Sequence, residues 1–168
     1  MKISFFSNRI NFAGDALDKY GLGGSESALI NITTCLKRNF PNDEITVYNG
    51  NTKKEYHDYY GVVYKTIDEF KLDVRSFNQD AFICLRQVLP FSLPFIDSKL
   101  KILWSQDDMN EHDLIQLKNN SYSRENIDLI FAISEYAKND IQNTFLEKEV
   151  LLQRNGYRED WISSKNNN

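Results

Sequence analysis

A glycine-rich turn, Gly21-Leu22-Gly23-Gly24, runs directly into a long segment whose apolar residues have helical spacing. Glycine lets a ligand approach the backbone, and a helix N-terminus offers unpaired N–H groups and a partial positive charge. Gly23, Gly24 and Ser25 are therefore candidate contacts for a phosphate group. In an equally consistent interpretation the glycines only shape a turn, Ser25 caps the helix and Glu26 complements its dipole.

This turn differs from a dinucleotide-binding fingerprint in two ways. The stretch from Asn8 to Tyr20 is too long for a tight strand-to-helix turn, and the next apolar run ends at Tyr48-Asn49-Gly50 without a carboxylate for a ribose. We therefore do not expect a nicotinamide cofactor.

A second polar cluster, Trp104-Ser105-Gln106-Asp107-Asp108, closes another apolar run and is followed by Glu111-His112-Asp113. Carboxylates and an amide at the end of a strand could orient sugar hydroxyls. A metal site would need the following turn to fold Asp107, Asp108 and His112 together, and we expect no metal. The alternative for the acidic residues is a solvated helix start, where they favour the dipole.

Arg86-Gln87 and Ser134-Glu135-Tyr136 also follow apolar runs and could line the same cleft. Ser134 is better suited to cap a helix than to contact a ligand. A stretch rich in tyrosine and lysine, 53–60, could touch a membrane interface or a sugar ring, but a surface loop with stacked tyrosines is the commoner explanation. Neither His57 nor His112 has an identifiable partner for nucleophilic catalysis.

Short apolar runs and helical segments alternate along the chain, which predicts an α/β fold with a doubly wound, mostly parallel sheet and helices on both faces. Right-handed crossovers would then gather the carboxyl ends of all strands on one edge, where such folds bind ligands. The expected strands are Ile3–Ser7, Ile45–Tyr48, Ala81–Leu85, Lys101–Ser105, Ile127–Ile133 and Val150–Gln153. The expected helices are Ser25–Phe40, a short one opened by the capping pair Thr66 and Glu69, Glu111–Lys118, and Ser134–Phe145.

The composition limits the classes of partner that we expect. The 168 residues carry 20 basic and 24 acidic side chains, a net charge of −4, with no block of lysine or arginine. This balance argues against nucleic acid or an anionic membrane as the main partner, and no apolar run is long enough to span a membrane. Cys35 and Cys84 both lie in apolar runs and are expected to be buried, reduced thiols in a cytoplasmic protein.

Five segments in order resemble the N-terminal domain of GT-B retaining glycosyltransferases. They are Lys2-Ile3-Ser4-Phe5, Gly23-Gly24-Ser25-Glu26, Leu103-Trp104-Ser105-Gln106-Asp107, Ala132-Ile133-Ser134-Glu135-Tyr136 and Gln153-Arg154-Asn155-Gly156-Tyr157. In that family two Rossmann-like domains face one another across a cleft, the N-terminal one mainly holding the acceptor and the C-terminal one a nucleotide-sugar.

The resemblance implies a role for each candidate residue. Gly23, Gly24 and Ser25 would lie near the donor diphosphate, and Asp107 would be the catalytic residue facing the reacting sugar. No metal or other cofactor is implied. The acceptor, a carbohydrate or a lipid-linked one, would meet Asn8, Arg86, Gln106, Asp107, Ser134 and Glu135.

Two departures from the family pattern matter. Gln106 stands where family members often carry a histidine, and an amide donates a hydrogen bond but cannot titrate. The Asn155-Gly156 step normally precedes the second domain, so we expect a truncated, acceptor-side half: a domain over 1–158, a tail or interdomain start over 159–168, and little turnover alone. A non-catalytic module that binds carbohydrate or nucleotide, or a domain that docks another protein, are the alternatives.

Overall fold

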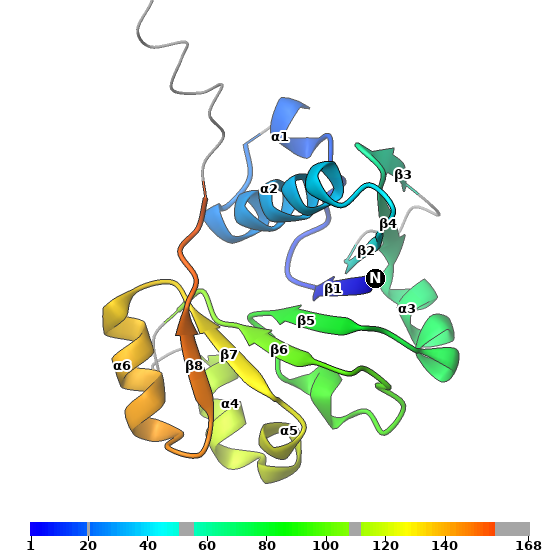
Figure 1. The fold of residues 1–168 in the computed structure, drawn as a ribbon. Helices are drawn as coiled ribbons and strands as arrows, with labels where there is room; N and C mark the ends of the chain where they lie inside the picture. Colours follow the sequence, from blue (N-terminus) through cyan, green and yellow to red (C-terminus); the bar gives the residue numbers. More distant parts are fainter. Residues whose placement is uncertain (20, 51–55, 108–111, 157–168) are drawn as a thin grey trace, which may run out of the picture.

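The computed structural model describes residues 1–19, 21–50, 56–107 and 112–156, which form one α/β sandwich (Figure 1). The expected tail over 159–168 lies outside these residues. Within them, no helix is long and apolar enough to cross a membrane.

The described strands build one eight-stranded sheet in the order β3-β4-β2-β1-β5-β6-β7-β8. Every neighbouring pair is parallel except β3 and β4, which are antiparallel. The doubly wound, mostly parallel fold expected from the sequence is thus confirmed. The strands are β1 Lys2–Ser7, β2 Glu44–Asn49, β3 Tyr56–Tyr59, β4 Val62–Thr66, β5 Ala81–Leu85, β6 Lys101–Trp104, β7 Leu129–Ala132 and β8 Glu149–Leu152.

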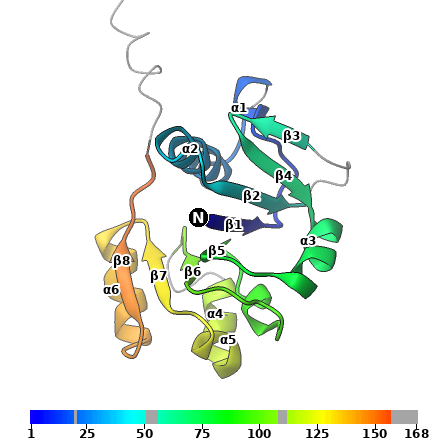
Figure 2. The ribbon, with the colours of Figure 1, turned by 45° about the vertical axis from the view of Figure 1, so that its right-hand side comes forward.

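Helices cover both faces of the sheet (Figure 2). The α-helices are α1 Ala16–Lys19, α2 Gly24–Asn39, α3 Ile67–Asp73, α4 His112–Asn119, α5 Ser121–Glu125 and α6 Glu135–Thr144, with 3-10 turns η1 Val74–Ser76 and η2 Leu89–Ser92. Buried residues of α1 and α2 belong to one hydrophobic cluster, and buried residues of α3, α4 and α6 belong to the other.

Side chains that alternate along the strands contribute to both of these cores. In β6, Ile102 and Trp104 join the core under α2 whereas Leu103 joins the opposite one, because successive side chains of a strand point to opposite faces. The core on the α3 side is rich in aromatic rings, with Phe82 stacked on Phe70 at 5.9 Å between centroids and edge-on to Phe91 at 5.9 Å. Burial on both faces explains why the central strands read as continuous apolar runs.

The hairpin of β3 and β4 corrects the expectation of a surface loop over 53–60. Residues 51–55 lie outside the described part, but Tyr56–Tyr59 pairs with β4 as an edge strand. Tyr60 and Gly61 make the turn with φ of 53° and 83°, the left-handed pair that a two-residue hairpin of type I′ requires. Rings of Tyr59 and Tyr60 do meet, edge to face at 4.6 Å.

Local sequence signals set several helix boundaries. Thr66 and Glu69 form the expected capping box at the start of α3. The Oγ of Ser134 accepts the N–H of Ala137 at 3.1 Å and so caps α6, as predicted. The cap of α2 is instead Gly23, so the alternative in which Ser25 caps that helix is wrong.

The two cysteines differ. Cys84 is fully buried in the sheet as expected, whereas Cys35 is exposed on α2, which corrects its predicted burial. Cys35 lies roughly 200° around the helix from the buried Thr33, and therefore on the outer face.

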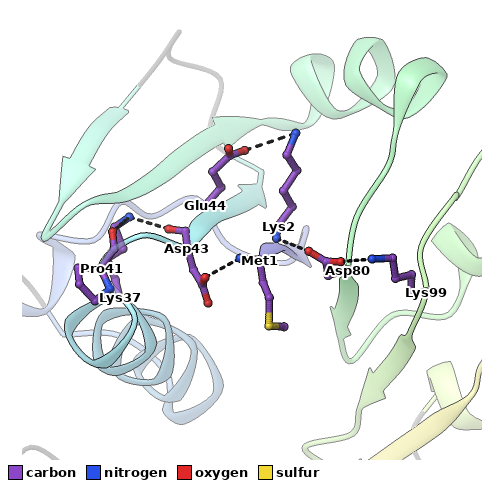
Figure 3. A network of polar contacts seen from close by, with 8 residues as sticks. All are labelled: Met1, Lys2, Lys37, Pro41, Asp43, Glu44, Asp80 and Lys99. Carbon is purple, nitrogen blue, oxygen red and sulfur yellow. Dashed lines mark hydrogen bonds and ion pairs between the residues drawn. The ribbon is translucent and has the colours of Figure 1, made fainter.

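The amino edge of the sheet is tied together by charged groups (Figure 3). The N-terminal ammonium of Met1 pairs with Asp43 at 2.5 Å, and Asp80 accepts the N–H of Lys2 at 2.8 Å and the Nζ of Lys99 at 2.6 Å. A pocket of about 370 Å³ lies here. Parallel α/β sheets bind ligands at the opposite, carboxyl edge. We therefore assign these ion pairs at the amino edge a structural role.

Candidate functional site

The carboxyl edge of the sheet contains a topological switch point between β1 and β5. From β1 the chain continues to β2 on one side, and it later returns to place β5 on the other side of β1. Crevices outside the carboxyl ends of strands at such a point are where open α/β sheets bind ligands. Asn8 and Arg86, both predicted as acceptor contacts, directly follow these two strands.

Asn8 is held at the switch point by contacts on both sides. Its backbone N–H donates to the Oε1 of Gln87 at 3.1 Å. On the other side, a Cβ at Gly50 would lie 3.2 Å from the Oδ1 of Asn8 and 2.5 Å from the Oδ1 of Asn11. Because Gly50 has no side chain, the Oδ1 atoms of Asn8 and Asn11 can both lie close to the backbone at the end of β2.

Arg86 and Asp107 form an ion pair between the ends of β5 and β6. The Nε of Arg86 donates to the Oδ2 of Asp107 at 2.6 Å, with side chains only 20% and 23% exposed. Arg86 has a φ of 62°, a left-handed conformation that is uncommon for residues other than glycine and that clusters at functional sites. Its backbone N–H donates to the carbonyl of Trp104 at 3.0 Å, which fixes this conformation against β6.

Asp107 is also anchored from its own strand end. The hydroxyl of Ser105 donates to the Asp107 carbonyl at 2.9 Å. The predicted catalytic carboxylate is therefore fixed in position, with Arg86 compensating its charge.

Gln106 pairs with a residue far along the chain. Its Oε1 accepts the Nδ2 of Asn155 at 2.8 Å, and its Nε2 donates to the Oδ1 of Asn155 at 3.2 Å. Gln106 is 7% exposed, so this reciprocal amide pair satisfies a nearly buried group. It also draws the segment after β8 back over the carboxyl edge, and in both views that segment passes beside α2 (Figures 1 and 2).

These contacts form one continuous series, which we call the carboxyl-edge chain. Gln87 bonds to Asn8, and its sequence neighbour Arg86 bonds to Asp107. Gln106, the sequence neighbour of Asp107, bonds to Asn155. The members of the series follow the ends of β1, β5, β6 and β8. Its members are Asn8, Gln87, Arg86, Asp107, Gln106 and Asn155.

Ser134 and Glu135, also predicted as acceptor contacts, follow β7. Among the described residues, they make no hydrogen bond or ion pair with the carboxyl-edge chain. The hydroxyl oxygen of Ser134 is engaged as the cap of α6. Glu135 is exposed in the first turn of that helix, where its charge complements the dipole.

The N-terminus of α2 carries the other predicted contacts. Gly23 has an ordinary φ of −63°, and a Cβ added to Gly24 would meet nothing within 4 Å. The fold itself does not require glycine at position 24, which is consistent with close approach of a ligand to the backbone. Ser25 lies next along the first turn.

Sequence reasoning missed three features of the site. Gln87 and Asn155 stood in segments that the sequence singled out, but their pairing with Asn8 and Gln106 depends on the sheet order and was not predicted. Glu26 was expected to complement the helix dipole, and its near-complete burial, at 3% exposed, was not predicted.

A metal site finds no basis in the described part of the chain. Asp108 lies outside it, and the same holds for the side chain of His112. Across residues 1–19, 21–50, 59–107 and 114–156, no group of three or more His, Cys, Asp or Glu side chains could hold a metal ion.

Comparisons with models of known protein families, with curated proteins and with solved structures find no match to this chain.

Proposed function

We propose that this chain is the acceptor-side half of a retaining glycosyltransferase, which moves a sugar from a nucleotide-sugar to an acceptor hydroxyl. The observation that carries the proposal is the carboxyl-edge chain, a series of amide, guanidinium and carboxylate groups at the switch point of a parallel sheet. Together these groups supply donors and acceptors, because the guanidinium donates, the carboxylate accepts and the amides do both, which suits the hydroxyls of a sugar.

The residues divide by position. Asp107 and Gln106, at the end of β6, would face the reacting sugar and the acceptor, with Asn8 and Arg86 contacting the acceptor beside them. Ser134 and Glu135 would border the same site from β7. The N-terminus of α2, whose capping residue Gly23 has no side chain, would lie near the donor together with Gly24 and Ser25.

In the reaction the bond between the anomeric carbon and the diphosphate oxygen breaks, and the acceptor oxygen forms a bond to the same face of that carbon. The proton of the acceptor hydroxyl leaves with the nucleoside diphosphate. Hydrogen-bond donors and positive groups stabilise the charge that develops on the leaving group. The proposal assigns most of the donor site to a second domain, in the same protein or a partner chain.

A second candidate is a non-catalytic module that binds carbohydrate or nucleotide. The geometry of Asp107 favours this candidate, because its carboxylate is already engaged by an ion pair with Arg86 at 2.6 Å. This candidate predicts saturable binding and no transfer under any conditions.

A thermal-shift titration with UDP-, GDP- and ADP-sugars tests donor binding by this chain. Ligand at 100 times its dissociation constant adds about 2.7 kcal/mol to the free energy of unfolding. At roughly 2–4 °C per kcal/mol, a donor site held by this chain alone raises the melting temperature by about 5–11 °C, whereas no rise assigns the donor site to the second domain. Gly24→Val should abolish the shift, whereas Gly21→Val is the matched control, because a Cβ at either glycine meets nothing within 4 Å.

A transfer assay separates the two candidates. Supplying the donor-binding half, in cis or as a separate chain, should produce transfer from one nucleotide-sugar of a broad panel. Complete inactivity of an intact two-domain form across that panel would count against the glycosyltransferase and leave the binding module.

A further inference from the structure

The guanidinium of Arg86 is held through its Nε and not through its two Nη groups. Its Nε donates to the Oδ2 of Asp107 at 2.6 Å. Neither Nη group donates to a described residue, and the side chain is 20% exposed. The N–H donors of both Nη groups are therefore available to a ligand at the carboxyl edge.

Arg124 is an arginine of the same chain whose guanidinium is fully used by the fold. Its Nε pairs with Glu147 at 3.1 Å and its side chain is 27% exposed, so its ion pair and burial resemble those of Arg86. Its Nη1, however, donates to the carbonyls of Leu117 at 3.4 Å and Lys118 at 3.0 Å. Arg86 differs because no such acceptors meet its Nη groups among the described residues.

The side chain of Arg86 is also fixed before a ligand arrives. Asp107 holds the guanidinium, and the backbone N–H of Arg86 donates to the carbonyl of Trp104 at 3.0 Å in the left-handed conformation, with φ at 62°. Strained backbone of this kind clusters at functional sites. A donor group that is already positioned loses less conformational entropy when it binds.

Two neighbouring Nη groups match one kind of ligand group best. A carboxylate or a phosphate accepts two parallel hydrogen bonds from the planar fork of a guanidinium, and its charge strengthens both of them. A neutral hydroxyl offers a single oxygen to the same fork and gains no charge attraction.

The charge around Arg86 favours an anion as well. The first three residues after β1, β5, β6, β7 and β8 include three arginines, Arg9, Arg86 and Arg154, and two carboxylates, Asp107 and Glu135. Arg9 and Arg154 are exposed. These strand ends therefore carry an excess of positive charge, although the chain as a whole has a net charge of −4.

We propose that Arg86 binds an anionic group of the acceptor, a carboxylate or a phosphate, through parallel hydrogen bonds from its two Nη groups. The Nδ2 of Asn8 and the Nε2 of Gln87 donate to no described residue, and they bind hydroxyls of the sugar that carries the anion. The acceptor is thus an acidic or a phosphorylated sugar. This rests on the proposed function in placing the acceptor at the carboxyl edge.

The test follows the backbone amide signals of the ¹⁵N-labelled chain by NMR. The probes are glucose, glucuronate and glucose 6-phosphate, which differ only at the sixth carbon, and inorganic phosphate. Glucuronate or glucose 6-phosphate should shift the signals of Asn8, Arg86, Gln87 and Asp107 in a saturable way, with an affinity at least about tenfold above that of glucose. Which of the two binds more tightly distinguishes a carboxylate from a phosphate. Added salt should weaken the anionic sugar and leave glucose unchanged.

Arg86→Lys tests the guanidinium itself because it keeps the positive charge and removes the fork. The anionic sugar should bind roughly tenfold more weakly to this variant, with glucose unaffected. Arg124→Lys is the matched control, since it changes an arginine of similar exposure in α5, before the amino end of β7, and should alter no probe. If Arg86→Lys does not fold, the comparison of glucose with the anionic sugars in the unmodified chain still decides.

Four results would overturn the inference: glucose binding as tightly as both anionic sugars, inorganic phosphate binding as tightly as glucose 6-phosphate, an anionic sugar unaffected by Arg86→Lys, or no shift at these amides with any anionic probe. Glucose binding at the same amides would leave the proposed function standing with a neutral acceptor. Conversely, selective binding of an anionic sugar together with no transfer by an intact two-domain form would remove the glycosyltransferase and keep the anion site of Arg86.

Discussion

The left-handed backbone of Arg86 makes a prediction about stability whose sign is unusual. At most positions glycine is less stable than alanine because it loses more conformational freedom on folding. Arg86 has a φ of 62°, where a residue with a Cβ is strained by about 1–2 kcal/mol. We therefore expect Arg86→Gly to be more stable than Arg86→Ala.

The magnitude follows from two contributions. Both variants lose the ion pair to Asp107, made at 2.6 Å by side chains 20% and 23% exposed. With solvent screening this loss is about 1–2 kcal/mol. Only the glycine variant also releases the backbone strain, so it should exceed the alanine variant by about 1 kcal/mol after its extra entropy in the unfolded state is counted.

Urea denaturation with a shared m-value measures the difference, and thermal melting should show it as a gap of roughly 2–4 °C. The Gln87→Gly and Gln87→Ala pair is the matched control, because Gln87 does not have a positive φ and its side-chain contact to Asn8 is lost equally in both. There the alanine variant should be the more stable. Equal stability of the two Arg86 variants, or a more stable alanine variant, would refute the strain argument.

Three further outcomes are expected. Thr66→Ala should lower the free energy of unfolding by about 1–2 kcal/mol in urea denaturation, since it removes the capping box of α3, and an unchanged midpoint would contradict that role. A thiol reagent should modify Cys35 in the folded chain but not Cys84, whose pKa burial raises well above its usual value; rapid reaction of Cys84 would speak against its burial. The hydrogen bond from Lys99 lowers the pKa of Asp80, so the carboxylate stays ionised in the folded chain at pH values where it is protonated when unfolded. Its contribution to stability is present above the unfolded pKa and lost as the pH falls through the folded one, and NMR titration showing an ordinary pKa for Asp80 would contradict this.

Much of the fold could be predicted because its signals are local. A strand buried on both faces must be apolar throughout, so β5 was placed at its observed bounds, Ala81–Leu85. Caps act within one turn, which is why Thr66 and Ser134 could be assigned from spacing alone. The β3–β4 hairpin escaped this reasoning because its strands are short and rich in polar and tyrosine residues.

The candidate site was predictable only as a set of strand ends. Alternation of strands and helices places Asn8, Arg86 and Asp107 on one edge, but it does not say which side chains meet there. The pairing of Gln106 with Asn155 joins residues 49 positions apart and depends on the order of the strands. The left-handed φ of Arg86 likewise arises from its anchoring to β6 rather than from its own preference.

The sequence by itself therefore determined the period, polarity and ends of most elements, since these depend on neighbours a few residues away. Tertiary structure alone decided that Cys35 faces outward, that Glu26 is nearly buried, and that six polar residues meet beyond the ends of β1, β5, β6 and β8. Each of these depends on which distant surfaces pack together, and packing partners are chosen by the sheet order and not by local spacing.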